Sequence, residues 1–273
     1  MGRFDGILLC SDFDGTLAVK KRISPENCDA IRYFQANGGR FTALSGRTPD
    51  FLKEHLQGFE ANAPLVGCNG ALIKDVQSGA LLYEGGRNDS KALDAFEPFW
   101  RESEHIKRIF AFDRHAVTYS CARKVSEDAF LTMEELRDHL CFPLYKVVCS
   151  VDDGDYAVML RDVLAERLGA CFEVSRSCPT YVEVSCIDAN KGAAALRLKQ
   201  MLGAKLLVTA GDYENDISML RAADIGYAVG NASPEVKAAA DRVTVDVGEH
   251  AIAAIVNELD KAYKNTSSAE SIA

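Results

Sequence analysis

The chain has 273 residues, with 31 basic and 40 acidic side chains and a formal net charge of −9 at neutral pH. Nucleic acids and anionic membranes are bound mainly through basic patches, so this balance argues against either as the main partner. A small phosphorylated ligand is not excluded, because a few local donors and a cation can hold a phosphate whatever the global charge.

The nine cysteines form neither CxxC pairs nor Cys/His clusters with zinc spacing. We therefore expect buried, reduced thiols in a cytoplasmic protein. The N-terminal residues enter a predicted strand without the apolar region of a signal peptide, and no apolar run approaches the length that spans a membrane. The sequence leaves the oligomeric state open.

Strand and helix signals alternate in the first part of the chain, a pattern typical of βαβ units around a parallel sheet. Ser24-Pro25 and Thr48-Pro49 each combine an N-cap residue with a proline in the first turn, so we expect helices to begin there. The expected strands span residues 6–10, 40–44 and 64–68, and a hairpin follows at 71–74 and 80–84.

From residue 85 to residue 186 helices are mixed with short alternating strands. We expect helices at 90–104 and 155–168, and strands at 108–112, 117–120, 144–151, 172–175 and 181–185. A compact α+β module of this size is typical of one domain.

The first pattern resumes after Asn190, with helices expected at 191–202, 215–222, 234–239 and 250–263 and strands at 205–210, 225–228 and 243–245. The sequence therefore predicts an α/β core domain formed by residues 1–84 and 187–264, into which an α+β domain, residues 85–186, is inserted. Residues 265–273 are small and polar, and we expect a disordered tail there.

Two carboxylates, Asp12 and Asp14, follow the almost wholly apolar strand that ends at Cys10. Such a strand suits a parallel sheet covered on both faces, and open α/β sheets bind ligands at the carboxyl ends of their strands. Like charges this close repel unless a proton or a cation neutralises one of them. Asp-x-Asp-Gly is also an ordinary polar turn, so other loops must decide between the two interpretations.

Three further loops carry polar residues. Ser45-Gly46-Arg47 offers a hydroxyl, a backbone N–H and a cation beside a helix N-terminus, which suits a phosphate but also a simple helix start. Lys191 begins a predicted helix, where a lone lysine is most often a solvated surface charge. Gly211–Asp216 combines three acids with an amide, and is either a ligand site or an acidic helix cap.

Each residue type in these loops can serve in a cation-assisted phosphoryl transfer. An oxygen-rich cluster of Asp12, Asp14 and Asp212, without sulfur or imidazole, suits a hard cation such as Mg²⁺. A carboxylate can attack phosphorus to form an aspartyl phosphate, while a second acid protonates the leaving oxygen and later deprotonates water. A lysine and a hydroxyl can neutralise and orient the transferred group.

The polar loops form separated motifs in a fixed order: Ser-Asp-Phe-Asp-Gly-Thr-Leu at 11–17, Leu-Ser-Gly-Arg at 44–47, Cys-Asn-Gly-Ala at 68–71, Asn-Lys-Gly at 190–192 and Gly-Asp-Tyr-Glu-Asn-Asp-Ile-Ser-Met-Leu at 211–220. With these motifs the sequence resembles the haloacid dehalogenase-like (HAD) superfamily hydrolases, specifically the Cof-type phosphatases of subclass IIB, over nearly its whole length. The resemblance implies a Rossmann-like parallel-sheet core with an inserted α+β cap domain of type C2B.

The resemblance also implies a role for each site residue. Asp12 would be the nucleophile and Asp14 the general acid/base. The phosphoryl group would be bound by Ser45, Gly46, Lys191 and Asn215. The Mg²⁺ ligands would be Asp12, the backbone carbonyl of Asp14, and Asp212, with Asp216 as a further ligand or a support for the others. Arg47 and Asn69 would line the site without fixed roles.

We therefore expect a Mg²⁺-dependent phosphatase that hydrolyses small phosphomonoesters, such as sugar phosphates or phosphorylated cofactors, through an aspartyl-phosphate intermediate. A phosphomutase shares the nucleophile and the metal and remains an alternative, as does a non-catalytic phospho-acceptor or binding protein. Substrate selectivity is expected in the cap, which would close over the site. Its candidates for a second anionic group of the substrate are Arg108, Arg114, Arg123 and Lys146, although lysines and arginines are most often plain surface charges.

Overall fold

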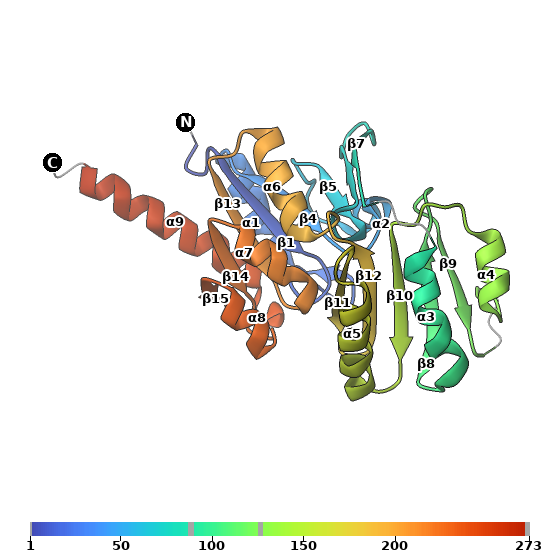
Figure 1. The fold of residues 1–273 in the computed structure, drawn as a ribbon. Coiled ribbons are helices and arrows are strands. Elements are labelled where there is room, and N and C mark those ends of the chain that lie inside the picture. Colours follow the sequence, from blue (N-terminus) through green and yellow to red (C-terminus); the bar gives the residue numbers. More distant parts are fainter. Residues whose placement is uncertain (1, 87–89, 125–127, 271–273) are drawn as a thin grey trace. The chain divides into compact units, whose positions relative to one another are not determined.

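The computed structural model describes residues 2–86, 90–124 and 128–270, with 264–270 as backbone only (Figure 1). The chain divides into two compact units: Met1–Tyr83 with Lys191–Ala273, and Glu84–Asn190. We call the first the core unit and the second the inserted unit. These bounds lie within a few residues of the domain bounds expected from the sequence.

The core unit is built on an eight-stranded sheet in the order β15-β14-β13-β1-β4-β5-β6-β7. β1 pairs in parallel with β13 on one side and with β4 on the other, and β5 pairs antiparallel with β6. The bounds of these strands are β1 Ile7–Asp12, β4 Arg40–Leu44, β5 Leu65–Gly67, β6 Leu72–Lys74, β7 Leu81–Glu84, β13 Leu206–Gly211, β14 Ile225–Ala228 and β15 Arg242–Val243. Both segments of the unit therefore meet at β1.

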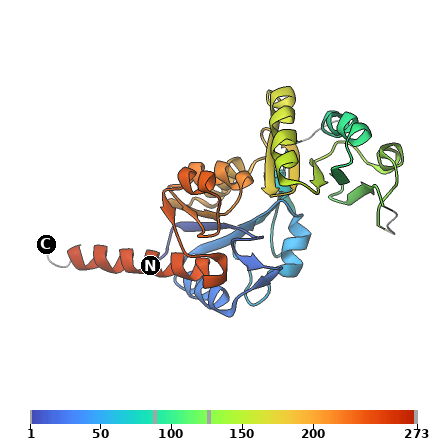
Figure 2. The same cartoon turned by 90° about the horizontal axis from the view of Figure 1, so that it is seen from below.

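Helices cover both faces of this sheet. In Figure 2 the blue helix near the N-terminus and the long red helix at the C-terminus lie on one side of the sheet, and the orange helices lie on the other. Leu9 of β1 packs in the cluster that includes residues of α1 (Pro25–Ala36) and α9 (Ala251–Glu270). Leu8 and Cys10 face the opposite cluster, which includes residues of α6 (Lys191–Leu202) and α7 (Ile217–Ala222). Burial on both faces explains why β1 is an apolar run without alternation.

The helices begin where the sequence places their caps. Ser24 Oγ accepts the backbone N–H of Asn27 at the start of α1, and Thr48 Oγ1 accepts that of Phe51 at the start of α2 (Pro49–His55). A further capped helix, α8, spans Pro234–Ala239. Short 3₁₀ turns lie at Cys68–Gly70, Glu214–Asp216 and Val247–Glu249. The small hairpin of β2 (Ala18–Val19) and β3 (Arg22–Ile23) is not predicted by the sequence pattern.

The inserted unit contains a five-stranded sheet in the order β11-β12-β10-β8-β9, in which each strand pairs antiparallel with its neighbours. Its strands are β8 Ile106–Phe112, β9 Thr118–Ala122, β10 Lys146–Val151, β11 Phe172–Cys178 and β12 Tyr181–Cys186. Its helices are α3 Lys91–Glu102, α4 Met133–His139 and α5 Gly154–Leu168. One apolar cluster joins these helices to one face of the sheet. The unit is therefore α+β.

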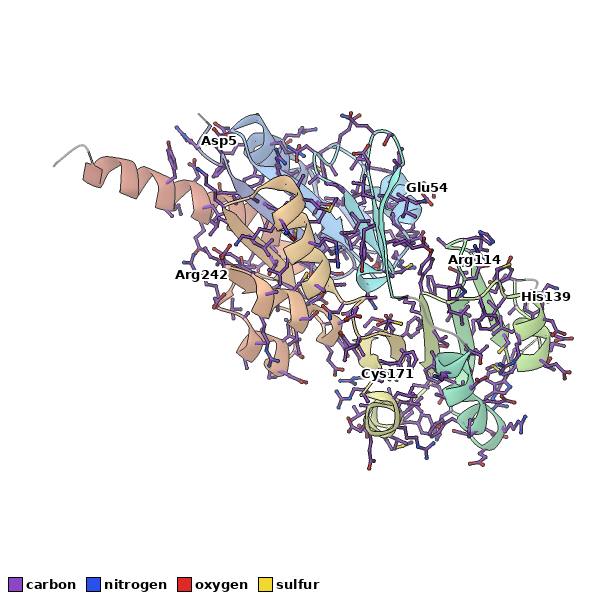
Figure 3. All side chains as sticks on the ribbon, turned by 45° about the horizontal axis from the view of Figure 1, so that its top comes forward. Asp5, Glu54, Arg114, His139, Cys171 and Arg242 are labelled. Atoms are coloured by element: carbon purple, nitrogen blue, oxygen red, sulfur yellow. The ribbon has the colours of Figure 1, made fainter. Side chains whose placement is uncertain are left out.

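Three sequence expectations differ from the structure. Helix α4 is not among the expected helices, although Thr132 and Glu135 form a capping box at its start. The cysteines are not all buried: Cys141 and Cys171 lie exposed in connecting segments, where loops meet solvent. Figure 3 labels Cys171. Helix α9 continues to Glu270, so residues 265–270 are helical instead of forming the expected disordered tail, and 271–273 lie outside the described residues.

None of the helices in the described part of the chain combines the length and the hydropathy that a membrane span requires.

Candidate active site

The register of the core sheet brings three polar loops to one edge. Asp12 ends β1 directly beside Leu44 of β4, and Ser11 lies beside Ala210 of β13. Because the three strands are parallel, the loops that follow them start at the same end of the sheet. Those loops carry Asp14, the Ser45-Gly46-Arg47 tripeptide and the 211–216 segment, as expected from the sequence.

Lys191 holds two carboxylates together at this edge. Its Nζ donates to Oδ1 of Asp12 at 2.5 Å and to Oδ1 of Asp216 at 2.5 Å. The lysine is 1% exposed and Asp216 is fully buried. Lys191 is therefore no solvated surface charge but the centre of a buried ion cluster, which the sequence alone favours less.

Asp216 uses both of its oxygens inside the protein. Oδ1 accepts Lys191, and Oδ2 accepts the backbone N–H groups of Asp212 at 2.9 Å and Tyr213 at 3.1 Å. These bonds fix the turn that presents Asp212. Of the two roles left open for Asp216, the contacts favour support of the loop over direct ligation.

Asp212 is held from the opposite loop. Its Oδ1 accepts the hydroxyl of Thr16 at 2.8 Å. Gly15, which precedes that threonine, has φ +88°, and a Cβ at Gly15 would lie 2.4 Å from Oδ2 of Asp212. Glycine is required here by both the backbone conformation and the close approach of the carboxylate. Thr16 is not among the site residues expected from the sequence, although it belongs to the first motif.

A three-carboxylate cluster results. One oxygen each from Asp12, Asp212 and Asp216 lie within 4.8 Å of one another. Three carboxylates face one ammonium, so two negative charges stay uncompensated when all three are ionised. An all-oxygen donor set with an excess of negative charge fits a hard divalent cation such as Mg²⁺.

The pKa values of these residues are shifted by burial and by the same excess of negative charge. Burial raises the pKa of Asp12 well above its ordinary range, against the opposing effect of Lys191. Burial, followed by the charge of Asp216, raises the pKa of Asp212 to about 7. Burial alone would lower the pKa of Lys191, but Asp12 and Asp216 together raise it, so the lysine stays charged. The cluster therefore binds protons tightly when no cation is present.

The Ser45 loop and the 68–70 turn support each other. Ser45 Oγ accepts the backbone N–H of Arg47 at 3.1 Å, and Ser45 O accepts that of Asn69 at 3.0 Å. Cys68 and Asn69 both have positive φ, 51° and 57°, which is uncommon for residues other than glycine. Buried Asn215 donates its side-chain N–H to Asn69 Oδ1 at 3.4 Å. The structure thus brings Ser45, Asn69 and Asn215 into one polar network.

Asp14 lies outside the lysine cluster. Its side chain is 44% exposed, against 8% for Asp12, and its Oδ2 accepts Nε of Arg47 at 3.0 Å. The two acids of the first motif therefore have different cationic partners. The ion pair with Arg47 is a contact that the sequence could not place.

Asn231 is a second residue that the sequence does not assign to the site. Its Nδ2 donates to the carbonyl of Gly15 at 2.9 Å, while its Oδ1 accepts the N–H of Val247 at 2.9 Å. It ties the loop of the first motif to the segment after β15. No spacing rule of the sequence predicts this contact.

Three of the four cationic candidates of the inserted unit are engaged within that unit. Arg108 donates to both oxygens of Asp128, and Arg123 Nε donates to the carbonyl of Ile106. Lys146 is 2% exposed and lies 2.9 Å from Glu183, so it belongs to a buried ion pair and is not a surface charge. Arg114 is exposed, and its side chain extends from the segment after β8 (Figure 3).

Known proteins resemble this chain in sequence and in fold. Residues 9–256 match the family of haloacid dehalogenase-like hydrolases. The chain is 29% identical to a 5-amino-6-(5-phospho-D-ribitylamino)uracil phosphatase of Bacillus subtilis, over 87% of this chain and 89% of that protein. It is also 29% identical to phosphoglycolate phosphatase 2 of Saccharolobus solfataricus, over 87% and 85% of the two chains. A solved HAD subclass IIB sugar phosphatase superposes with a TM-score of 0.73 at 22% identity, over 95% and 98% of the two chains.

The chain therefore belongs to the haloacid dehalogenase-like hydrolases, and the family and enzyme class expected from the motifs are confirmed. The structural likeness confirms the expected HAD-like α/β fold with an inserted domain.

Proposed function

We propose that this hydrolase is a Mg²⁺-dependent phosphatase that hydrolyses small phosphomonoesters through an aspartyl phosphate on Asp12. The observation that carries the proposal is the buried Lys191, which holds Asp12 2.5 Å from its ammonium beside two further carboxylates. Phosphatase relatives that span most of the chain support the reaction type.

The donor set supports Mg²⁺ as the cation. Asp12, Asp212 and the backbone carbonyl of Asp14 would hold it, and Asp216 would orient Asp212 through the bonds to its turn. When bound, Mg²⁺ would supply positive charge that draws electron density from the phosphoryl group and reduces its repulsion of the attacking carboxylate.

In the first step, a carboxylate oxygen of Asp12 forms a bond to phosphorus while the bond from phosphorus to the ester oxygen breaks. The electron pair of that bond goes to the leaving oxygen, which takes a proton from Asp14. Lys191 stabilises the developing charge with an ammonium that needs no rearrangement, because Asp12 and Asp216 already hold it.

In the second step, water attacks phosphorus and gives its proton to Asp14. The bond between phosphorus and Asp12 breaks, inorganic phosphate leaves and the Asp12 carboxylate is restored. The Ser45 hydroxyl, the Gly46 N–H and the Asn215 amide would hold the phosphoryl oxygens, while Arg47 and Asn69 line the site. The other half of the substrate would be selected by the inserted unit, acting as a cap. A cytoplasmic location remains a prediction.

A phosphate-release screen over sugar phosphates, phosphorylated cofactors and phosphorylated acids, with and without Mg²⁺, tests the proposal. We expect Mg²⁺-dependent release that is abolished in Asp12→Asn and retained in Asp50→Asn, a matched change at an exposed carboxylate. Interconversion of sugar-phosphate isomers without free phosphate would indicate a mutase instead. A stable label on Asp12 without phosphate release would indicate a phospho-acceptor.

A further inference from the structure

Arg47 and Asp14 form an ion pair between two loops of the core unit. Nε of Arg47 donates to Oδ2 of Asp14 at 3.0 Å, and both side chains are nearly half exposed. The arginine follows β4 and the aspartate follows β1, so the pair joins neighbouring strands of the parallel sheet. An exposed pair of this kind contributes little to the free energy of unfolding. Its main effect is on the position of the Asp14 carboxylate.

The guanidinium is supported by an aromatic stack. The central carbon of Arg47 lies 4.8 Å from the centroid of the Phe51 ring, and His55 stacks on the same ring with centroids 3.9 Å apart. Phe13, which directly precedes Asp14, packs edge-on against Phe51 at 6.0 Å. The stack therefore touches the loop of Asp14 as well as the arginine. A planar guanidinium can stack on an aromatic ring and donate hydrogen bonds from its edge at the same time.

The backbone of Arg47 is fixed too. Its N–H donates to Ser45 Oγ at 3.1 Å, and its carbonyl accepts the N–H of Cys68 at 2.8 Å. Arg47 thus has a fixed backbone, a supported side chain and a defined partner. A side chain fixed in this way can in turn fix the Asp14 carboxylate that it contacts.

We infer that Arg47 is a positioning residue for Asp14, holding the carboxyl group that transfers the proton. This inference rests on the phosphatase reaction proposed above. Arg47 engages Oδ2, so proton transfer falls to Oδ1 of the same carboxyl group. The two acids of the Asp-x-Asp motif are kept in different roles by different cations, Lys191 for Asp12 and Arg47 for Asp14.

The alternative role of Arg47 is direct binding of the phosphoryl group, and kinetics separate the two. General acid catalysis contributes about 10²- to 10⁴-fold to rates, and it matters most for poor leaving groups. Loss of a positioning residue should therefore slow an alkyl phosphate strongly, whereas p-nitrophenyl phosphate, whose leaving group needs no proton, should still phosphorylate Asp12. Loss of a residue that binds the phosphoryl group should lower kcat/KM for both substrates alike and raise KM.

The experiment compares Arg47→Met and Arg47→Lys with the wild type and with Arg22→Met, a change at an exposed arginine of the same unit. For Arg47→Met we expect kcat on an alkyl phosphate to fall about tenfold to 100-fold, a part of the general acid contribution, with KM within about twofold. With p-nitrophenyl phosphate, a burst of nitrophenolate close to one per enzyme should persist and be followed by slow turnover. Arg47→Lys should recover part of kcat, and Arg22→Met should behave as the wild type.

A double variant decides whether Arg47 acts through Asp14. In the Asp14→Asn background, Arg47→Met should cause no further loss of kcat, because the carboxyl group that it positions is already absent. A further tenfold loss, or a lost burst with raised KM, would overturn the inference and assign Arg47 to phosphate binding. If Arg47→Met folds poorly, the same cycle with Arg47→Lys gives the answer. A wild type that forms no aspartyl phosphate would instead refute the proposed function, and the inference with it.

Discussion

Lys191 Nζ lies 2.5 Å from Asp12 Oδ1, although 179 positions separate the two residues in the chain. The contact joins the start of α6 to the end of β1, and therefore joins the two segments of the core unit on either side of the inserted unit. Motifs from the two sides of the inserted segment thus meet in a buried ion pair.

Replacing Lys191 by Met should abolish most activity and alter stability. The variant leaves Asp12 and Asp216 buried without their cation, and removal of one partner of a buried pair costs about 3 to 5 kcal/mol. We expect kcat/KM to fall at least about 100-fold, as for the loss of a positioned charge at a reacting group. Activity assays and chemical denaturation measure the two effects.

Lys199→Met is the matched control for Lys191→Met, because Lys199 lies on the same helix but pairs with Asp224 closer to solvent. It should change the free energy of unfolding by about 1 kcal/mol or less and leave kcat/KM unchanged. Equal behaviour of the two variants would contradict the special role of the buried lysine.

Without a cation, the raised pKa of Asp212 should make stability depend on pH. Its pKa rises from the ordinary value of 3.8 to about 7 in the folded protein. The folded state therefore binds the proton more tightly than the unfolded state, so this stabilisation is fully present below about pH 4 and is lost as pH rises towards 7. In chelator, wild type should lose a few kcal/mol relative to Asp212→Asn between about pH 4.5 and pH 7.5. A constant difference across this range would show that Asp212 is not desolvated as described.

Metal affinity should change with pH in the opposite sense. A cation must displace the proton of Asp212 below about pH 7, so affinity should fall about tenfold from pH 8 to pH 6. The rise in thermal midpoint caused by Mg²⁺ should accordingly be larger at pH 8. Isothermal titration at both pH values measures the effect directly, and Asp212→Asn should remove most of the binding. Affinity that is independent of pH would place the cation elsewhere.

Gly15→Ala should damage the site more than a similar change elsewhere. The new Cβ would lie 2.4 Å from Asp212 Oδ2, and φ is +88°. We expect Mg²⁺ binding to weaken at least about tenfold, since a loss of about 1.4 kcal/mol in binding free energy already corresponds to that factor. Gly79→Ala shares the positive φ, at +69°, but meets nothing within 4 Å, so it should cost about 1 kcal/mol of stability and leave binding unchanged. Equal Mg²⁺ affinities would contradict the role of the close approach.

Local signals predict the elements of the core unit well, because capping residues and apolar runs act within the segment that they shape. The strand at 40–44 and the helices at 191–202 and 234–239 have the expected bounds. Helix α4 escapes prediction despite its capping box, because its sequence is mostly charged and only Met133 and Leu136 are buried, which leaves little apolar pattern to recognise. The terminal residues, helical to Glu270, depend on propagation of α9 rather than on their composition.

The site is predictable as a set of residues but not as a set of contacts. Motif order indicates Asp12, Lys191 and Asp212, since the ends of parallel strands meet at one edge. Partners are a different matter: the pairing of Arg47 with Asp14 depends on how two loops turn, and the buried pairing of Lys146 with Glu183 depends on register in the inserted sheet. Charge type alone cannot distinguish a surface cation from one that is already paired.

The most direct test of the central claim is to look for the phosphoryl group on Asp12. The enzyme is mixed with a substrate from the screen and Mg²⁺, quenched in acid during turnover, and digested for mass spectrometry of the peptide that contains residues 7–20. We expect one phosphoryl group on Asp12 in the wild type and none in Asp12→Asn, which should also be inactive. Phosphate release by Asp12→Asn, or rapid turnover of wild type with the label on another residue, would contradict the claim.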